Sequence, residues 1–418
     1  MKIWLIKASE NLPIDDNSKL ERMGLMAEFL ARNGDEVTWW TSTFCHAKKK
    51  HRYKKNKSIV LNQNEKINLL YSAITYKKNI SIGRILYCKN MARILKREMI
   101  LAEQPDIIVC AWPIPEMARK TVLYAAKRNI PVVIDVRDLW PDIFLSIFPD
   151  NMQNALKFLI KPYEKLVERT MMNATGIIGV TEHAVLWGVR KARREIGCFD
   201  QIFPLACKKI QMTDAEIVQQ KKWWEKWNIT ESTYNICFFS TLSLRGLDLE
   251  CFIKAVLIAS EKYNNLRFII GGTGDGEKYY KKIAGDSKNI VFAGWLNEKQ
   301  MSTAMMMSIC GVYCLKNTED LKNTFSNKIV QYLEGGLPVI SSLTGKSKEI
   351  IEKNRMGIIY QEGDVKDCCM QILRLIEDKE FFNDMRVNSR TYYEINHESN
   401  TVNKKICEYL HQIVRNIN

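Results

Sequence analysis

Residues 1–42 decide the fold, with MKIWLIKA at 1–8, LERMGLMAEFLARN at 20–33 and EVTWWTS at 36–42. The first and third stretches are short and apolar, which is typical of buried strands, and the middle one has the spacing of an amphipathic helix. Asn33-Gly34 is a typical helix stop. The three stretches predict a strand, a helix and a second strand, which is the unit of a parallel sheet.

The same alternation continues along the first half of the chain. Further strands are predicted at Lys66–Tyr71, Asp106–Trp112, Pro131–Asp135 and Gly176–Thr181. After a connector at Phe203–Lys209 the pattern restarts, with strands predicted at Asn235–Thr241, Leu266–Gly271, Ile290–Ala293, Gly311–Leu315 and Pro338–Ser342. Short apolar strands separated by helices indicate sheets that are covered on both faces.

The predicted fold class is therefore α/β, with two Rossmann-like, doubly wound parallel-sheet domains and an interdomain cleft. We expect an acceptor-binding domain over residues 1–203 and a nucleotide-binding domain over 204–396. A final helix over 397–418 is expected to pack back on the first domain.

Composition excludes several classes of protein. The chain has 418 residues, of which 46% are hydrophobic and 26% charged, so we expect globular domains rather than extended disorder. No apolar run is long enough for a membrane span, and no export signal is visible at the start of the sequence. The twelve cysteines form no C-x-x-C pair, and the five histidines lack ligand spacing. We expect reduced thiols in a cytoplasmic protein without a metal site.

The net charge of +15 is concentrated in the first half of the chain. Residues 1–206 contain 33 basic and 21 acidic side chains, which gives +12 of the total. The densest part is HAKKKHRYKKNK at 46–57, just after an aromatic stretch. An anionic membrane surface, nucleic acid or solvent alone would each suit this segment, but no nucleic-acid recognition module accompanies it. We expect peripheral contact with the inner face of the cytoplasmic membrane through Trp39, Trp40, Lys48, Lys49, Lys50, Arg52, Lys54 and Lys55.

In the first domain, polar residues follow the predicted strands, where ligands bind in doubly wound sheets. The turn over 10–18 contains no glycine, which disfavours a dinucleotide at this position. Ser18 and Glu21 have the spacing of a capping box, while Asp15 and Asp16 could bond hydroxyl groups of a polar acceptor. The expected acceptor-binding residues are Asp15, Asp16, Arg22, Glu182 and His183, and Arg137 and Asp138 are expected at the cleft wall, with a mutual salt bridge as the alternative.

In the second domain the strand ends suit a nucleoside diphosphate. Arg245 offers a planar set of donors to phosphate, and the glycines after 271 would let a ligand approach the backbone. The sequence TFSNK at 324–328 opens a helix, and free amides with a lysine at a helix start form an anion site. The expected donor-binding residues are Gly272, Trp295, Leu296, Asn323, Ser326, Asn327 and Gln331.

The chain resembles bacterial retaining glycosyltransferases of family 4, which have the GT-B fold, and in particular the L-fucosamine transferase-like polysaccharide-assembly group. The resemblance rests on RMGLMAEFL at 22–30, WWTSTF at 39–44 and VRDLWP at 136–141. In the second half it rests on SNKI at 326–329, GLPVI at 336–340, EIIE at 349–352 and Gly363-Asp364. The family's paired glutamates, which are separated by seven other residues, fall here on Asn323 and Gln331.

The resemblance implies transfer of a sugar from a nucleotide sugar to a lipid-linked or polysaccharide acceptor, with retention of anomeric configuration. A UDP-sugar is the favoured donor. Such an acceptor would be a glycan on a polyprenyl diphosphate, in capsule, O-antigen or exopolysaccharide assembly. Arg245 and Lys328 would stabilise the leaving diphosphate, Asp138 would orient the acceptor, and no metal or other cofactor would be needed. Two alternatives stay open on the same fold, a sugar-nucleotide epimerase and a binding scaffold without activity.

Overall fold

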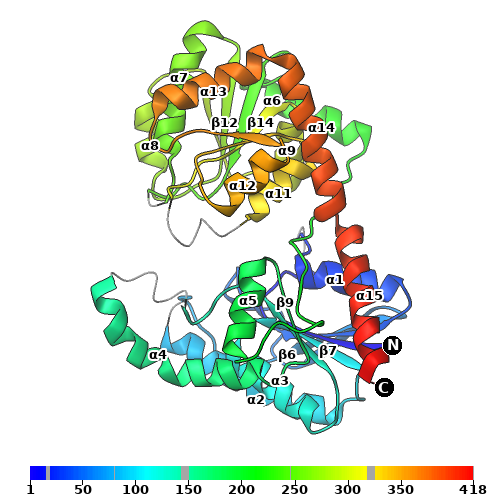
Figure 1. Cartoon of the computed structure of the whole chain (residues 1–418). Helices are drawn as coiled ribbons and strands as arrows, with labels where there is room; N and C mark the ends of the chain where they lie inside the picture. Colours follow the sequence, from blue (N-terminus) through cyan, green and yellow to red (C-terminus); the bar gives the residue numbers. More distant parts are fainter. Residues whose placement is uncertain (16–18, 80, 143–149, 245, 318–324, 418) are drawn as a thin grey trace. The chain divides into compact units, whose positions relative to one another are not determined.

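The computed structural model describes residues 1–15, 19–79, 81–142, 150–244, 246–317 and 325–417, with the side chains of 150–159 excepted. The chain divides into two compact units, Met1–Ala206 with Ser399–Asn418 and Cys207–Glu398 (Figure 1). The unit boundaries fall within three residues of the expected ones at 203 and 396.

The first unit contains a largely parallel sheet in the order β10-β9-β8-β7-β1-β2-β6-β5. Its strands are β1 (Lys2–Ile6), β2 (Glu36–Ser42), β5 (Lys57–Asn62), β6 (Glu65–Leu70), β7 (Ile107–Trp112), β8 (Val132–Val136), β9 (Gly176–Gly179) and β10 (Gln201–Ile202). The edge strand β5 pairs antiparallel with β6, which the sequence analysis did not predict. A short hairpin of β3 (Phe44–Cys45) and β4 (Lys50–His51) encloses the start of the basic segment.

Helices cover both faces of this sheet. One face packs against α2 (Ile82–Leu101), α3 (Pro115–Ala126), α4 (Asp150–Met171) and α5 (Glu182–Lys191). The other face packs against α1 (Arg22–Arg32) and the C-terminal helix α15 (Ser399–Ile417), which lies beside α1 (Figure 1).

The second unit contains a parallel sheet in the order β13-β12-β11-β14-β15-β16. Its strands are β11 (Tyr234–Phe239), β12 (Leu266–Gly271), β13 (Ile290–Gly294), β14 (Ser308–Tyr313), β15 (Val339–Ser341) and β16 (Gly357–Ile359). The helices are α6 (Asp214–Glu225), α7 (Leu249–Lys262), α8 (Glu277–Ala284), α9 (Glu298–Met306), α11 (Asn327–Glu334), α12 (Lys346–Lys353), α13 (Val365–Glu377) and α14 (Lys379–Asn396). Helices α7, α8 and α13 share one core with the sheet, and α9 and α11 contact its other face.

In both units the strands and their connections agree with the predicted doubly wound α/β class. All twelve cysteines are unpaired thiols, and most of them are buried. Among the described residues, no helix has both the length and the apolar character that crossing a bilayer requires.

Candidate functional site

Helix α11 is fixed by Tyr332, whose ring packs on Gly311 of β14, where a Cβ atom would lie only 2.3 Å from it. The Tyr332 hydroxyl accepts a hydrogen bond from the Phe239 amide at 3.2 Å and donates one to the Val312 carbonyl at 3.2 Å. These contacts tie α11 to the ends of β11 and β14. Because α11 connects two parallel strands, its N-terminus lies at the edge where the strands end.

Lys328 is the second residue of α11, and Ser326 caps the helix by accepting a hydrogen bond from the Lys328 amide at 3.2 Å. Burial lowers the pKa of the Lys328 ammonium group. No carboxylate of the described residues forms an ion pair with it within 4.0 Å. A cation without such a partner at a helix N-terminus is suited to an anionic ligand.

The glycines after β12 allow neighbouring loops to pack closely. A Cβ atom at Gly272 would lie 1.9 Å from the Ser240 carbonyl oxygen, and one at Gly274 would lie 2.2 Å from that of Leu242. The Gly272 amide donates to the Gly294 carbonyl at 2.6 Å. These glycines therefore allow the loops after β11, β12 and β13 to pack together, and the approach of a ligand to their backbone stays a prediction.

The other expected donor-binding residues of the described chain are spread along the same sheet edge. Trp295 follows β13 and is 77% exposed, whereas Leu296 is buried against Gly271. Asn327 is exposed, and Gln331 is half-buried one helical turn after Lys328. Arg245 and Asn323, as well as the acceptor candidate Asp16, lie outside the described residues.

In the first unit, the ends of β1 and β8 hold a cluster of buried charges. The Asp135 carboxylate, fully buried, accepts hydrogen bonds from Arg22 Nε at 3.0 Å and from Arg137 Nε at 2.9 Å. Burial raises the pKa of Asp135, but the two guanidinium groups more than offset this, and its pKa is lowered overall. Glu10 pairs with Arg137 and also accepts a hydrogen bond from the Met23 amide in the first turn of α1 at 3.0 Å.

This cluster corrects the expected acceptor role of Arg22. Its Nη1 atom donates to the carbonyl oxygens of Phe203 and Pro204, each at 2.9 Å, so the side chain holds the connector to the ends of the strands. Arg137 does not pair with Asp138, which is exposed, but with Glu10 and Asp135. Sequence reasoning missed Glu10 and Asp135, although an aspartate inside the buried run VVID signals a need for cationic partners.

Two other expected acceptor residues, Glu182 and His183, are exposed at the start of α5, where Thr181 caps the helix by accepting from the Ala184 amide at 3.2 Å. Asp15 is already engaged, because Arg52 Nε donates to its carboxylate at 2.6 Å. That pair fastens the basic segment to the turn after β1. It also removes Arg52 from the expected membrane contacts.

The aromatic part of the expected membrane contact is wrong. Trp39 is 0% exposed and Trp40 is 3% exposed, because β2 lies between β1 and β6 and successive side chains point into the two covered faces of the sheet. Lys48, Lys50, Lys54 and Lys55 are exposed as expected, whereas Lys49 is half-buried. Its ammonium group donates to Asn79 Oδ1 at 2.6 Å.

The comparisons with known proteins agree with this geometry. Residues 233–378 match the family model of glycosyl transferases group 1, and no curated protein matches the sequence. HepE of Anabaena, solved in complex with UDP, is 14% identical, with 99% of this chain and 100% of that one covered and a TM-score of 0.64. Sucrose-phosphate synthase of Thermosynechococcus elongatus is 12% identical, with 99% of each chain covered and a TM-score of 0.69.

A further similar structure is WaaG, described as a glycosyltransferase involved in lipopolysaccharide biosynthesis. It is 12% identical, with 97% of this chain and 98% of that one covered and a TM-score of 0.62. At these identities the likeness concerns the fold. The chain thus has the GT-B fold of glycosyltransferases, and its residues 233–378, which include Lys328, match the family model of glycosyl transferases group 1.

Proposed function

We propose that this protein transfers a sugar from a nucleotide sugar, with UDP as the favoured nucleotide, to a lipid-linked or polysaccharide acceptor. The observation that carries the proposal is Lys328, a partly buried cation without a carboxylate partner in the described chain, at the start of α11. It lies within the segment that matches group 1 glycosyltransferases. The complexes of HepE with UDP and with UDP-glucose support UDP as the donor nucleotide.

The proposed transfer proceeds with retention of configuration. The bond between the anomeric carbon and the diphosphate oxygen breaks, and the acceptor oxygen forms a bond to the same face of that carbon. The acceptor proton passes to the departing phosphate oxygen. Lys328, the amides of the first turn of α11 and Arg245 would stabilise the developing negative charge, so the proposal assigns no metal to this step.

A matched pair of lysines tests the assignment. Lys328 is the second residue of α11, and the exposed Lys366 is the second residue of α13. Lys328→Ala should lower kcat by roughly 10²–10³-fold, as expected when one preorganised donor is lost, while Lys366→Ala should leave it unchanged. Equal turnover of the two variants would contradict the role of Lys328.

The pH dependence gives a second measurement on the same residue. Because its pKa is lowered, Lys328 loses its charge at a lower pH than an ordinary lysine, and kcat/KM of the wild type should fall on the alkaline side. Lys328→Arg keeps its charge throughout this range and should move the fall to higher pH. A profile that is the same for both proteins would mean that another group titrates.

The reaction itself is tested by incubating the protein with UDP- and GDP-sugars and a lipid-linked acceptor. Transfer with an unchanged anomeric configuration, read by nuclear magnetic resonance of the product, would agree with the proposal. Free isomerised nucleotide sugar would indicate an epimerase, and nucleotide binding without turnover would indicate a scaffold. Either of these two results would overturn it.

The acceptor side of the proposal includes a membrane surface on the first unit. Asn79 joins two elements there, since it accepts from Lys49 through its side chain at 2.6 Å and from Arg84 Nη1 through its carbonyl at 2.8 Å. The basic hairpin formed by β3 and β4 therefore lies beside the start of α2, where Ile82 is 77% and Leu86 is 48% exposed. These aliphatic side chains, one helical turn apart, take the place of the buried tryptophans as the apolar part of the contact.

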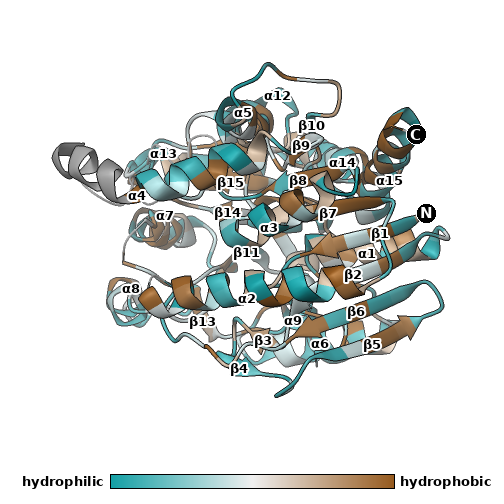
Figure 2. Ribbon diagram, turned by 90° about the horizontal axis from the view of Figure 1, so that it is seen from below, coloured by the Kyte–Doolittle hydropathy of each residue, from teal (hydrophilic) through white to brown (hydrophobic). Residues whose placement is uncertain are grey.

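Figure 2 shows apolar and polar stretches alternating along α2. The exposed Lys48 and Lys50 of this hairpin suit anionic headgroups, at about 1 kcal/mol for each lysine near the surface. The contact would be peripheral and reversible, at the inner face of the cytoplasmic membrane, where a glycan on a polyprenyl diphosphate would be presented.

A further inference from the structure

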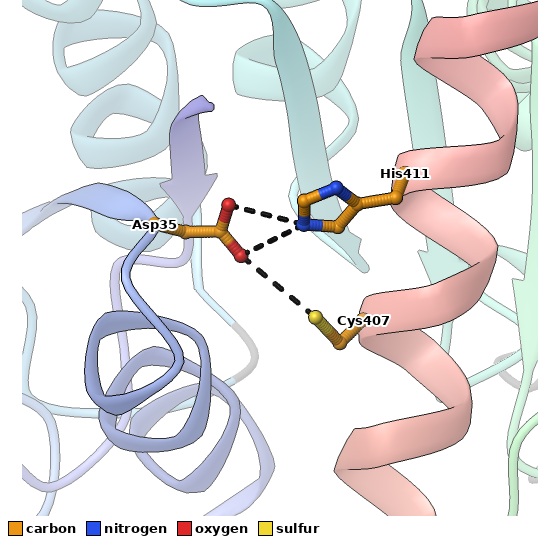
Figure 3. A group of neighbouring side chains, drawn as sticks. All are labelled: Asp35, Cys407 and His411. Atoms are coloured by element: carbon orange, nitrogen blue, oxygen red, sulfur yellow. Dashed lines mark hydrogen bonds and ion pairs between the residues drawn. The ribbon is translucent and has the colours of Figure 1, made fainter.

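Asp35, Cys407 and His411 converge between the start of β2 and the C-terminal helix of the first unit (Figure 3). Asp35 lies in the turn between α1 and β2 and is 2% exposed. Cys407 and His411 are four residues apart on α15, so both side chains lie on one face of the helix. A carboxylate, a thiol and an imidazole thus meet from two segments that are far apart in the sequence.

The contacts within this group are close. His411 Nε2 lies 3.1 Å from each of the two carboxylate oxygens of Asp35. Cys407 Sγ lies 3.8 Å from Asp35 Oδ2, and one ligand atom from each residue lies within 4.8 Å of the others. In a tetrahedral zinc site, bonds of about 2.0–2.3 Å place neighbouring ligand atoms about 3.3–3.6 Å apart. The distances from Asp35 Oδ2 to His411 Nε2 and to Cys407 Sγ, 3.1 and 3.8 Å, lie on either side of that range.

The two oxygens of Asp35 have different surroundings. Oδ1 accepts a hydrogen bond from the amino group of Met1 at 3.0 Å, and Oδ2 contacts Cys407 Sγ. Coordination through Oδ2 alone would leave the Oδ1 ion pair intact. That ion pair would then orient the carboxylate, as outer partners commonly do for metal ligands.

We propose that Asp35, Cys407 and His411 bind one Zn²⁺ ion, which ties α15 to the turn before β2. Thiolate and imidazole ligands favour zinc over magnesium or calcium, which prefer oxygen. Three protein ligands leave the fourth position of a tetrahedral ion to water. The site is separate from α11 and Lys328, so it does not depend on the proposed transferase activity.

Binding must displace a proton from the thiol. Burial and the neighbouring Asp35 carboxylate raise the pKa of Cys407 to about 11, so the thiol is protonated at neutral pH when no metal is bound. A zinc ion stabilises the thiolate, and one proton is released to solvent for each ion bound. The apparent affinity should accordingly increase with pH.

The test uses metal-free full-length protein, Co²⁺ as a spectroscopic probe, and Zn²⁺ in competition with a chromophoric chelator. We expect one ion per chain, a thiolate-to-cobalt charge-transfer band, and loss of that band on addition of Zn²⁺. Cys407→Ser should abolish the band, and His411→Ala should weaken Zn²⁺ binding at least about 100-fold. Cys198→Ser removes an exposed cysteine of the same unit and should change neither result.

Several outcomes would overturn the proposal. Wild-type protein that fails to compete with the chelator has no such site, whatever the variants do. A cobalt band that survives in Cys407→Ser, or disappears in Cys198→Ser, would place the metal on another thiol. Circular dichroism of each variant, recorded without metal, shows whether a lost band reflects a lost ligand or a lost fold.

Discussion

At the scale of single residues, the packing of the loops after β11 and β12 depends on Gly272 having no side chain. Its φ angle of +129° is unfavourable for other residues, and a Cβ atom would overlap the Ser240 carbonyl. Gly272→Ala should therefore lower the free energy of unfolding by about 3 kcal/mol or more, measured by urea denaturation. Gly335→Ala is the control, because Gly335 has a helical φ of −71° and its nearest neighbour would lie at 3.4 Å. Similar losses in the two variants would contradict this account.

The stability of the first unit depends on Asp135, which pairs with both Arg22 and Arg137. Replacing it with alanine leaves the guanidinium groups of Arg22 and Arg137 buried without their common partner, and we expect a loss of about 3–5 kcal/mol in stability. Because its pKa is lowered in the folded state, this stability is present above about pH 4 and is lost as pH falls through the folded-state pKa. Denaturation at pH 7 and at pH 3 measures both effects. Glu103→Ala, which removes an exposed ion pair with Lys2, should leave the stability almost unchanged, because solvent screens exposed pairs.

At the scale of elements, the start of α2 and the basic hairpin should act together on lipid. Vesicles containing anionic lipid should sediment the protein at low salt, and moderate salt should release it, because charge attraction is screened over about 8 Å. Replacing both Ile82 and Leu86 with serine should reduce sedimentation. The matched control replaces Ile100 and Leu101, which are 52% and 76% exposed at the other end of the same helix. Sedimentation that changes neither with salt nor with the replacement of Ile82 and Leu86 would contradict the proposed membrane surface. Binding to nucleic acid but not to vesicles would show that nucleic acid is the partner of this surface instead.

The sequence predicted most strands because each is a short apolar run between helices, and it predicted α11 from its helix-start residues. The prediction failed where the same sequence pattern is compatible with both a buried and an exposed side chain. In the run 36–42, tryptophans beside a basic segment could equally be exposed or lie in a central strand, and only the order of strands decides between them. The pair of Asp15 and Arg52 could not be predicted either, since it joins residues that no local pattern connects.

At the scale of the whole molecule, the two units should unfold separately. UDP at 100 times its Kd should stabilise the unit that contains α11 by about 2.7 kcal/mol and leave the other transition in place. Leu410→Ala, at a fully buried position of α15, should instead lower the transition of the first unit, by about 2–5 kcal/mol. Differential scanning calorimetry of both proteins, with and without UDP, measures these shifts. A single transition that moves with both UDP and the variant would show that the units unfold together.

The return of the chain through α15 has a consequence for how such a protein can be recombined. The first unit is built from both ends of the polypeptide, and Cys207–Glu398 is an insertion between them. A single crossover between two related genes would therefore combine the sheet of one protein with the last helix of the other. The side chains at Val402, Ile406 and Leu410 would then pack against a core from a different protein. Exchange of the unit that contains α11 without this mismatch requires two crossovers, one near residue 206 and one near residue 398, so that Cys207–Glu398 moves as a whole.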